Sequence, residues 1–176
     1  MRSIGLFAAF LLACAGAPAA AQTFGPPISG MCLLSRTGAI DASHASKSLQ
    51  AQLKPMQAKL SAELAQQREA IARRRQQLEA RQNTIAPIEY QRQLATLDQQ
   101  IRNLDRQQNA RFITAQTRAQ QQIDHALNAA LSSVITRHAC SVVMERNSAY
   151  GWNNAMDITP AVTVEMNKIL QAVDVR

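Results

Sequence analysis

The sequence predicts a mainly helical α+β protein, in which a long antiparallel helical hairpin stands on a small β-body. Apolar residues recur every three or four positions through residues 45–139, a proline-containing break divides this stretch into two arms, and short strand-like runs flank it. The composition agrees, because the chain is rich in Ala, Gln, Leu and Arg and only 4% aromatic. Such a composition favours long helices over a sandwich or barrel.

Residues 1–21 are typical of a secretory signal peptide. Arg2 supplies the positive start, the apolar run Ile4–Ala17 follows, and Ala19–Ala21 is a small-residue cleavage site that would leave Gln22 first. The run is shorter than the roughly 20 apolar residues of a membrane span. We therefore expect export to the periplasm.

Cysteine positions raise two further possibilities. Leu11–Cys14 resembles a lipobox, so the alternative to a soluble form is a lipoprotein anchored at Cys14. Cleavage after residue 21 would leave Cys32 and Cys140, a pair that can form a disulfide in an oxidising compartment. The alternative is two small buried thiols.

The N-terminal half begins with a flexible segment, residues 22–30, which is rich in Gly and Pro. Met31–Leu34 is a short apolar run with turn residues on both sides, as expected for a buried strand. The first arm follows, and Pro55 inside it predicts a kink or a new helix start. Its apolar seam thins outward, because polar residues take alternate core positions at Gln67, Arg74 and Arg81.

The second arm begins after a break at residues 83–87. Pro87 suits the first turn of a helix, and Glu89 suits the positive N-terminal end of the helix dipole. Its apolar positions again follow three- and four-residue steps, ending near Val134. Two arms of about 40 and 50 residues joined by a short turn predict an antiparallel hairpin roughly 60–75 Å long.

The C-terminal part returns to strand-like patterns. Cys140–Met144 and Ala149–Trp152 are predicted strands, and Asp157–Pro160 opens a last helix with Thr159 as its N-cap. Trp152 and Tyr150 are expected in the core of the body rather than in a ligand cage, since large aromatics dominate protein cores. Residues 31–44 and 140–176 would thus form the body, and residues 45–139 the hairpin.

The positive charge belongs to the hairpin. Residues 45–139 carry 14 Lys and Arg against 7 Asp and Glu, a balance of +7, whereas the rest of the chain after residue 21 carries 4 against 5. The two interpretations are a solvated helix face and a surface for anions such as lipopolysaccharide phosphate, anionic lipid or acidic polypeptide. The candidate contacts are Arg68, Arg73, Arg74, Arg75, Arg81, Arg92, Arg102 and Arg106.

Catalytic motifs do not occur in the sequence. It has no glycine-rich phosphate loop, no H-E-x-x-H and no nucleophile elbow. His138 and Cys140 would supply two metal ligands, whereas a structural zinc site normally takes four. We therefore expect no enzyme activity, cofactor or metal, and no nucleic-acid partner, because aromatics for base stacking do not interleave with the basic residues.

In the order of its parts, the chain resembles the Skp (OmpH-like) periplasmic chaperones. The resemblance rests on the signal, a strand at Met31–Ser35, a helix start at Ser43–Lys47, a basic Gln-rich hairpin, a strand at Val142–Glu145, a tyrosine-bearing strand and a helix opened by 157–159. Three features depart from the family pattern: Pro55, the cysteine pair, and arginine in place of most lysines.

The resemblance implies a homotrimer whose strands join in a central body and whose three hairpins enclose a cavity for unfolded outer-membrane proteins. Residues expected in that body are Leu33, Leu34, Val142, Val143 and Trp152. The implied function is an ATP-independent holdase. The competing interpretation is a structural or adaptor coiled coil of the cell envelope, which would explain the hairpin but not the strands at its base.

Overall fold

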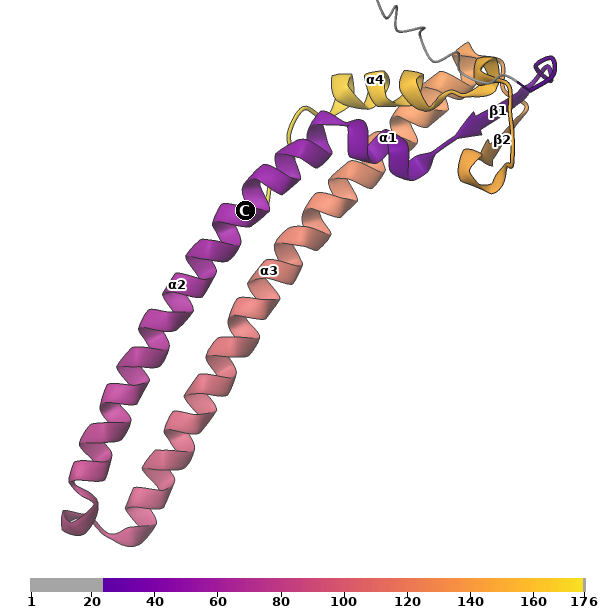
Figure 1. The fold of residues 1–176 in the computed structure, drawn as a ribbon. Coiled ribbons are helices and arrows are strands. Elements are labelled where there is room, and N and C mark those ends of the chain that lie inside the picture. Colours follow the sequence, from indigo (N-terminus) through magenta and orange to yellow (C-terminus); the bar gives the residue numbers. More distant parts are fainter. Residues whose placement is uncertain (1–23, 176) are drawn as a thin grey trace, which may run out of the picture.

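A long two-helix arm and a small head at one end of it make up the described part of the protein (Figure 1). The computed structural model describes residues 24–175, so the predicted signal peptide, the cleavage site before Gln22 and Cys14 lie outside the described residues. The elements in order are β1 (Met31–Leu34), α1 (Arg36–Ala42), α2 (His44–Ala80), η1 (Gln82–Thr84), α3 (Pro87–Arg137), β2 (Val142–Glu145), η2 (Arg146–Ser148), η3 (Asn154–Met156) and α4 (Thr159–Ile169).

The arm is the predicted antiparallel hairpin of α2 and α3, with 37 and 51 residues. These lengths correspond to about 55 and 75 Å. As predicted, Pro87 opens α3, and Glu89 lies in its first turn. Near the tip, a small apolar cluster joins the two helices through Ile71, Leu78 and Leu97. The mainly helical fold with a small sheet is therefore confirmed.

Pro55 does not start a new helix, because α2 runs through it without interruption. Proline removes the hydrogen bond that the carbonyl of Ala51 would otherwise accept. Ala51 and Pro55 are both exposed, so water can pair with that carbonyl. The apolar spacing of Leu53, Met56 and Leu60 places Pro55 off the seam, which agrees with its exposure.

The head has a core of its own, formed where α1, α4 and the base of the arm meet. Ile123, Leu127 and Val134 of α3 pack there against Ile158 and Met166, each at most 1% exposed. A buried aliphatic side chain contributes about 1.5–3 kcal/mol. This core therefore holds the arm firmly at its base, whereas the tip depends on a much smaller cluster.

Strands β1 and β2 pair in parallel, from Met31 opposite Val142 to Leu34 opposite Glu145. Parallel strands need a long crossover, and the whole hairpin provides it. Strand β1 is buried at three of its four residues, but β2 is mostly exposed. Figure 1 shows the two strands at the end of the head away from the arm.

Three expectations for the C-terminal part are wrong. Ala149–Trp152 is not a strand, because the segment between η2 and η3 has no ladder partner. The carbonyl of Trp152 accepts one hydrogen bond from the backbone N–H of Phe24. Tyr150 is fully exposed, so its expected place in the core is wrong as well. A strand requires a continuous row of backbone partners, which a single bond does not supply.

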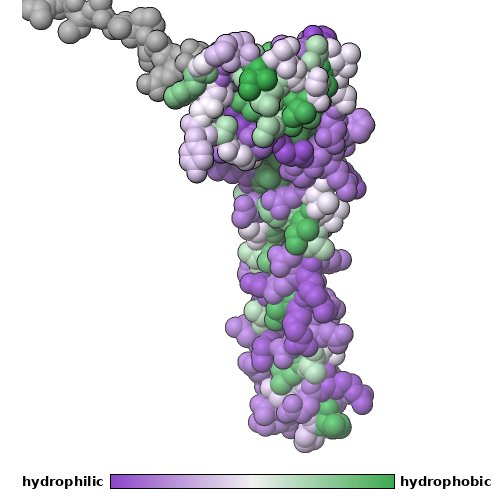
Figure 2. All heavy atoms as spheres, turned by 90° about the vertical axis from the view of Figure 1, so that its right-hand side faces the viewer, coloured by the Kyte–Doolittle hydropathy of each residue, from purple (hydrophilic) through white to green (hydrophobic). Residues whose placement is uncertain are grey.

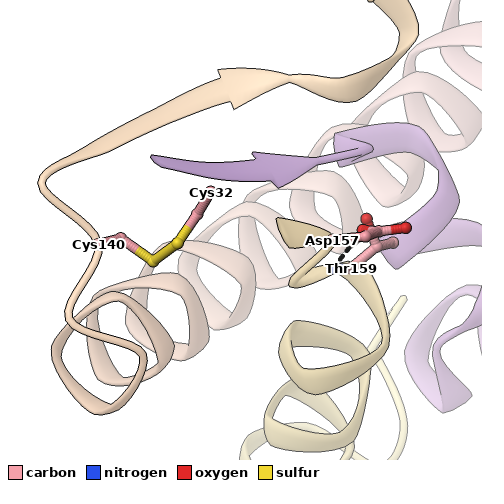
Figure 3. Close-up of a disulfide and its surroundings, with 4 residues drawn as sticks. All are labelled: Cys32, Cys140, Asp157 and Thr159. Atoms are coloured by element: carbon pink, nitrogen blue, oxygen red, sulfur yellow. Dashed lines mark hydrogen bonds between the residues drawn. A yellow bond between two sulfur atoms is a disulfide. The ribbon is translucent and has the colours of Figure 1, made fainter. Parts of the chain in front are cut away.

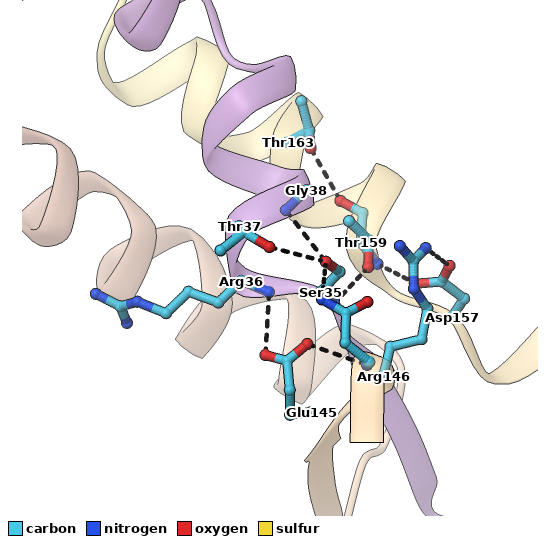
Figure 4. Close-up of polar contacts among 10 residues, drawn as sticks. Ser35, Arg36, Thr37, Gly38, Glu145, Arg146, Asp157, Thr159 and Thr163 are labelled. Atoms are coloured by element: carbon cyan, nitrogen blue, oxygen red, sulfur yellow. Dashed lines mark hydrogen bonds and ion pairs between the residues drawn. The ribbon is translucent and has the colours of Figure 1, made fainter. Parts of the chain in front are cut away.

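Thr159 is the first residue of α4 rather than its N-cap. Its hydroxyl oxygen Oγ1 instead accepts a 2.8 Å hydrogen bond from the backbone N–H of Ser35 (Figure 4). The carboxylate of Asp157 accepts a 2.9 Å bond from the backbone N–H of Thr159 and so takes the capping role. Thr159 thereby joins the end of β1 to the start of α4, a long-range pairing that local helix-start rules do not contain.

Candidate binding surface on the helical arm

The eight candidate arginines do not form one continuous cationic patch. Two are paired across the hairpin: Arg68 with Asp105 at 2.6 Å and Arg75 with Asp98 at 3.4 Å. Arg73 is paired with Glu69 one turn back on its own helix. Of the three consecutive arginines at 73–75, the first and the last therefore have different partners on different sides of α2.

The remaining candidates differ in the same way. Arg92 is paired with Glu89 at 3.3 Å, and Arg106 donates a hydrogen bond to the side-chain oxygen of Asn103. The ion pairs within residues 24–175 include none that involves Arg74, Arg81 or Arg102. These three guanidinium groups are the most available to an incoming anion. An exposed ion pair adds little stability, but its carboxylate already compensates the charge of the arginine.

On the face that Figure 2 draws, the apolar surface of the arm is divided into small separate areas. Figure 2 shows these areas between hydrophilic side chains, whereas the head carries a broader apolar region. Two shallow grooves of about 340 and 290 Å³ lie over the distal seam, and Arg74 lines both. Arg74, which interrupts the apolar seam in the sequence, therefore lies between two surface grooves in the folded arm.

The head residues expected in an oligomer body are divided between interior and surface. Leu33 and Leu34 are buried, Val143 and Trp152 are half-buried, and Val142 is 50% exposed. A cavity of about 370 Å³ opens beside them, lined mainly by apolar side chains such as Phe24, Ile28, Met31, Met144, Trp152 and Met156. Much of the exposed apolar surface of the head therefore lies around β2 and the N-terminal segment, and α4 adds Val164 and Ile169.

Arg146 is a structural residue of the head that is not among the residues predicted from the sequence. Its guanidinium is paired with the carboxylate of Asp157 at 2.7 Å and lies 5.5 Å from the ring of Trp152. Burial works to raise the pKa of Asp157, but hydrogen bonds from Thr159 and the contact with Arg146 outweigh it and hold the pKa below its usual value. A basic residue close to Trp152 in the sequence was the available signal.

A disulfide between Cys32 and Cys140 closes the base of the hairpin in the structure (Figure 3). The two Cα atoms are 5.7 Å apart, and 108 residues separate the cysteines in the chain. Cys32 lies in β1, whereas Cys140 comes two residues before β2 rather than within it. The bridge therefore joins the end of α3 directly to the first strand.

No metal centre or membrane span emerges from residues 24–175. Among these residues, no three His, Cys, Asp or Glu side chains come together as a metal site would require. None of the helices in the same range is long and apolar enough to cross a membrane.

Comparison with known proteins identifies the family. The model of the family described as outer membrane protein (OmpH-like) matches residues 32–166, which include the whole arm, β2 and most of β1 and α4. This chain belongs to the OmpH-like family. It is also similar to the crystal structure of a candidate outer membrane chaperone (OmpH-like) from Caulobacter crescentus, with a TM-score of 0.71 and 27% identity.

The structural match covers 88% of this chain and 93% of the Caulobacter chain. It therefore includes the head as well as the arm, which an unrelated coiled coil would not match. Among curated proteins, none matches this chain significantly. The resemblance inferred from the sequence is thus confirmed at the level of the family and its fold.

Proposed function

We propose that this protein is an ATP-independent periplasmic chaperone that holds unfolded outer-membrane β-barrel precursors and prevents their aggregation. The observation that carries the proposal is the family match over residues 32–166, which joins a basic hairpin to a strand-containing head. The similarity to the candidate chaperone of Caulobacter crescentus supports the same role. A spacer would have no use for such a head.

The arm has the properties that a holdase needs. Its balance of +7 attracts acidic unfolded chains, and its apolar surface is divided into small areas that each bind weakly. Many weak contacts over a large surface together give useful affinity without one fixed geometry. Release then requires only that the client's own folding compete with these contacts, so no nucleotide takes part.

We also propose that the protein works as a trimer joined through its head. Exposed apolar side chains gather there, including Val142, Met144 and Ile28. Surface of this kind commonly marks an interface between proteins. Three arms extending from one body would surround a client on several sides and would multiply the weak contacts of each arm.

Light scattering of a β-barrel protein diluted from urea tests the holding function. The protein should lower the scattering without ATP, and capture should slow as salt rises, because the screening length falls from about 10 Å at 0.1 M to about 3 Å at 1 M. Reversal of Arg74 and Arg81 to Glu should slow capture while leaving helicity and native mass unchanged, since both are exposed and neither takes part in an ion pair within residues 24–175. If the reversed variant captures the client as fast as the wild type, the charge of the arm does not drive capture.

A further inference from the structure

The distal half of the arm has two unlike sides. On one side, the pairs Arg68–Asp105 and Arg75–Asp98 cross from α2 to α3 and close the seam with charged side chains. Each of these arginines lies three residues before a seam residue, Ile71 or Leu78. Asp98 and Asp105 each come one position after a seam residue of α3, Leu97 or Leu104. This side therefore presents compensated charges over a covered seam.

The opposite side is open. Ala70 and Gln77 come two residues after Arg68 and Arg75, hence about 200° further around the helix. Here the two grooves of about 340 and 290 Å³ meet end to end at Arg74. The lining residues of the combined groove, named here the amide groove, are Gln67, Ala70, Ile71, Arg74, Gln77, Leu78 and Arg81 of α2, and Gln93, Thr96, Leu97, Gln100, Asn103 and Leu104 of α3.

The chemistry of the amide groove is distinctive. Its floor is apolar, from Ile71 and Leu104 at one end to Leu78 and Leu97 at the other. Its walls carry amides, which both donate and accept hydrogen bonds. Its only charged side chains are Arg74 and Arg81, which take part in none of the ion pairs within residues 24–175, and no carboxylate lines it. The groove therefore favours a chain with negative charge.

We propose that the amide groove binds an extended segment of an unfolded acidic polypeptide, and this inference rests on the proposed function. From residue 67 to residue 81 the groove is about 21 Å long at 1.5 Å per residue. A segment of about six extended residues at 3.3 Å per residue fills that length. Its apolar side chains lie on the floor, its backbone groups pair with the amides, and its carboxylates meet Arg74 and Arg81.

The opposed interpretation is that charge acts over the whole arm and that the groove has no special part. Substitutions at neighbouring glutamines distinguish these two interpretations. Gln67 and Gln77 line the amide groove, whereas Gln66 and Gln76 are exposed and lie outside it, about 100° away on the same helix. Changing either pair to Glu alters the net charge equally, at almost the same place.

The test compares Gln67→Glu/Gln77→Glu with Gln66→Glu/Gln76→Glu. Fluorescence anisotropy measures binding of a labelled, unstructured eight-residue acidic peptide and of its counterpart in which Asn and Gln replace the acids. Wild type should prefer the acidic peptide. The groove variant should bind it about five- to tenfold more weakly, because two contacts are replaced by repulsion, and the control variant should stay within about twofold of wild type.

Equal losses in both variants, or no loss in the groove variant, would overturn the proposal. Vesicles of anionic lipid provide a second probe: a groove variant that loses vesicle binding but keeps peptide binding would assign the groove to lipid and also overturn the proposal. Aggregation assays on the wild type separate this inference from the function. A wild type that keeps a β-barrel protein soluble, with no difference between the variants, contradicts the groove alone.

Discussion

The disulfide at the base of the arm should be one of the largest contributions to the stability of the head. We consider replacing both Cys32 and Cys140 with Ala, which removes the bridge without adding polar groups to a buried site. The bridge spans 108 residues, because the entire hairpin lies between its ends. In the chain-entropy model such a loop corresponds to about 4.8 kcal/mol of restricted freedom in the unfolded chain.

This value is an upper estimate, since an unfolded chain with residual helical hairpins is already restricted. For a chain of this length, each kcal/mol shifts the melting temperature by about 2–4 °C, so the loss of the bridge should lower it by about 10–20 °C. Circular dichroism at a fixed protein concentration measures the shift, and the fixed concentration matters because assembly also stabilises.

The variant without the disulfide is the control for the effect of reductant on the wild type. A phosphine reductant should lower the melting temperature of the wild type toward that of the variant and leave the variant unchanged. Mass spectrometry after alkylation of freshly isolated, non-reduced protein should find neither cysteine modified. Two alkylated thiols, or equal melting temperatures with and without reductant, would refute the reasoning.

Three further predictions concern the core, acid stability and export. Leu127→Ala should cost about 2–5 kcal/mol in urea unfolding, because Leu127 is 0% exposed in the head core, whereas Ile113→Ala on the same helix, 60% exposed, should change stability by under about 0.5 kcal/mol. The pKa of the Asp157 carboxyl is held below its usual 3.8, so its contribution to folding stability is complete above about pH 4 and is lost as the pH falls through the lowered pKa. Asp157→Asn removes this contribution and should therefore lower the melting temperature at neutral pH. Intact-mass analysis of the exported protein should find Gln22 first, and a diacylated species beginning at Cys14 would instead establish the lipoprotein.

Regular local signals account for the parts of the fold that the sequence predicts well. Apolar spacing of three and four residues fixes a helix face, and Pro87 marks where α3 can begin, so the hairpin follows from neighbouring residues alone. The strand at Met31–Leu34 was also predicted within its observed bounds. These features require no knowledge of distant parts of the chain.

Long-range pairing explains what the sequence could not predict. The hydroxyl of Thr159 accepts a hydrogen bond from the backbone N–H of Ser35, 124 residues away, instead of capping its own helix. Ala149–Trp152 has strand-forming residues but no partner strand in the chain as described. For the arm, Arg74 and Arg81 were recognised as interruptions of the seam, but the open groove they line appears only when both helices are placed side by side.

The central claim is that the distal arm is the holding element, and deletion of residues 68–106 tests it most directly. Arg68 and Asp105 face each other across the hairpin, so the cut shortens both helices at the same level and a short glycine-containing turn can rejoin them. The head core and its disulfide remain, because all their residues lie outside the deletion. Native mass and melting of the head provide the controls.

The measurement is light scattering of a β-barrel protein diluted from urea, with the wild type and the shortened variant compared at equal protomer concentration. The account predicts that the shortened protein keeps the oligomeric state of the wild type but no longer suppresses aggregation. A shortened protein that protects the client as well as the wild type does would contradict the account and favour an envelope spacer.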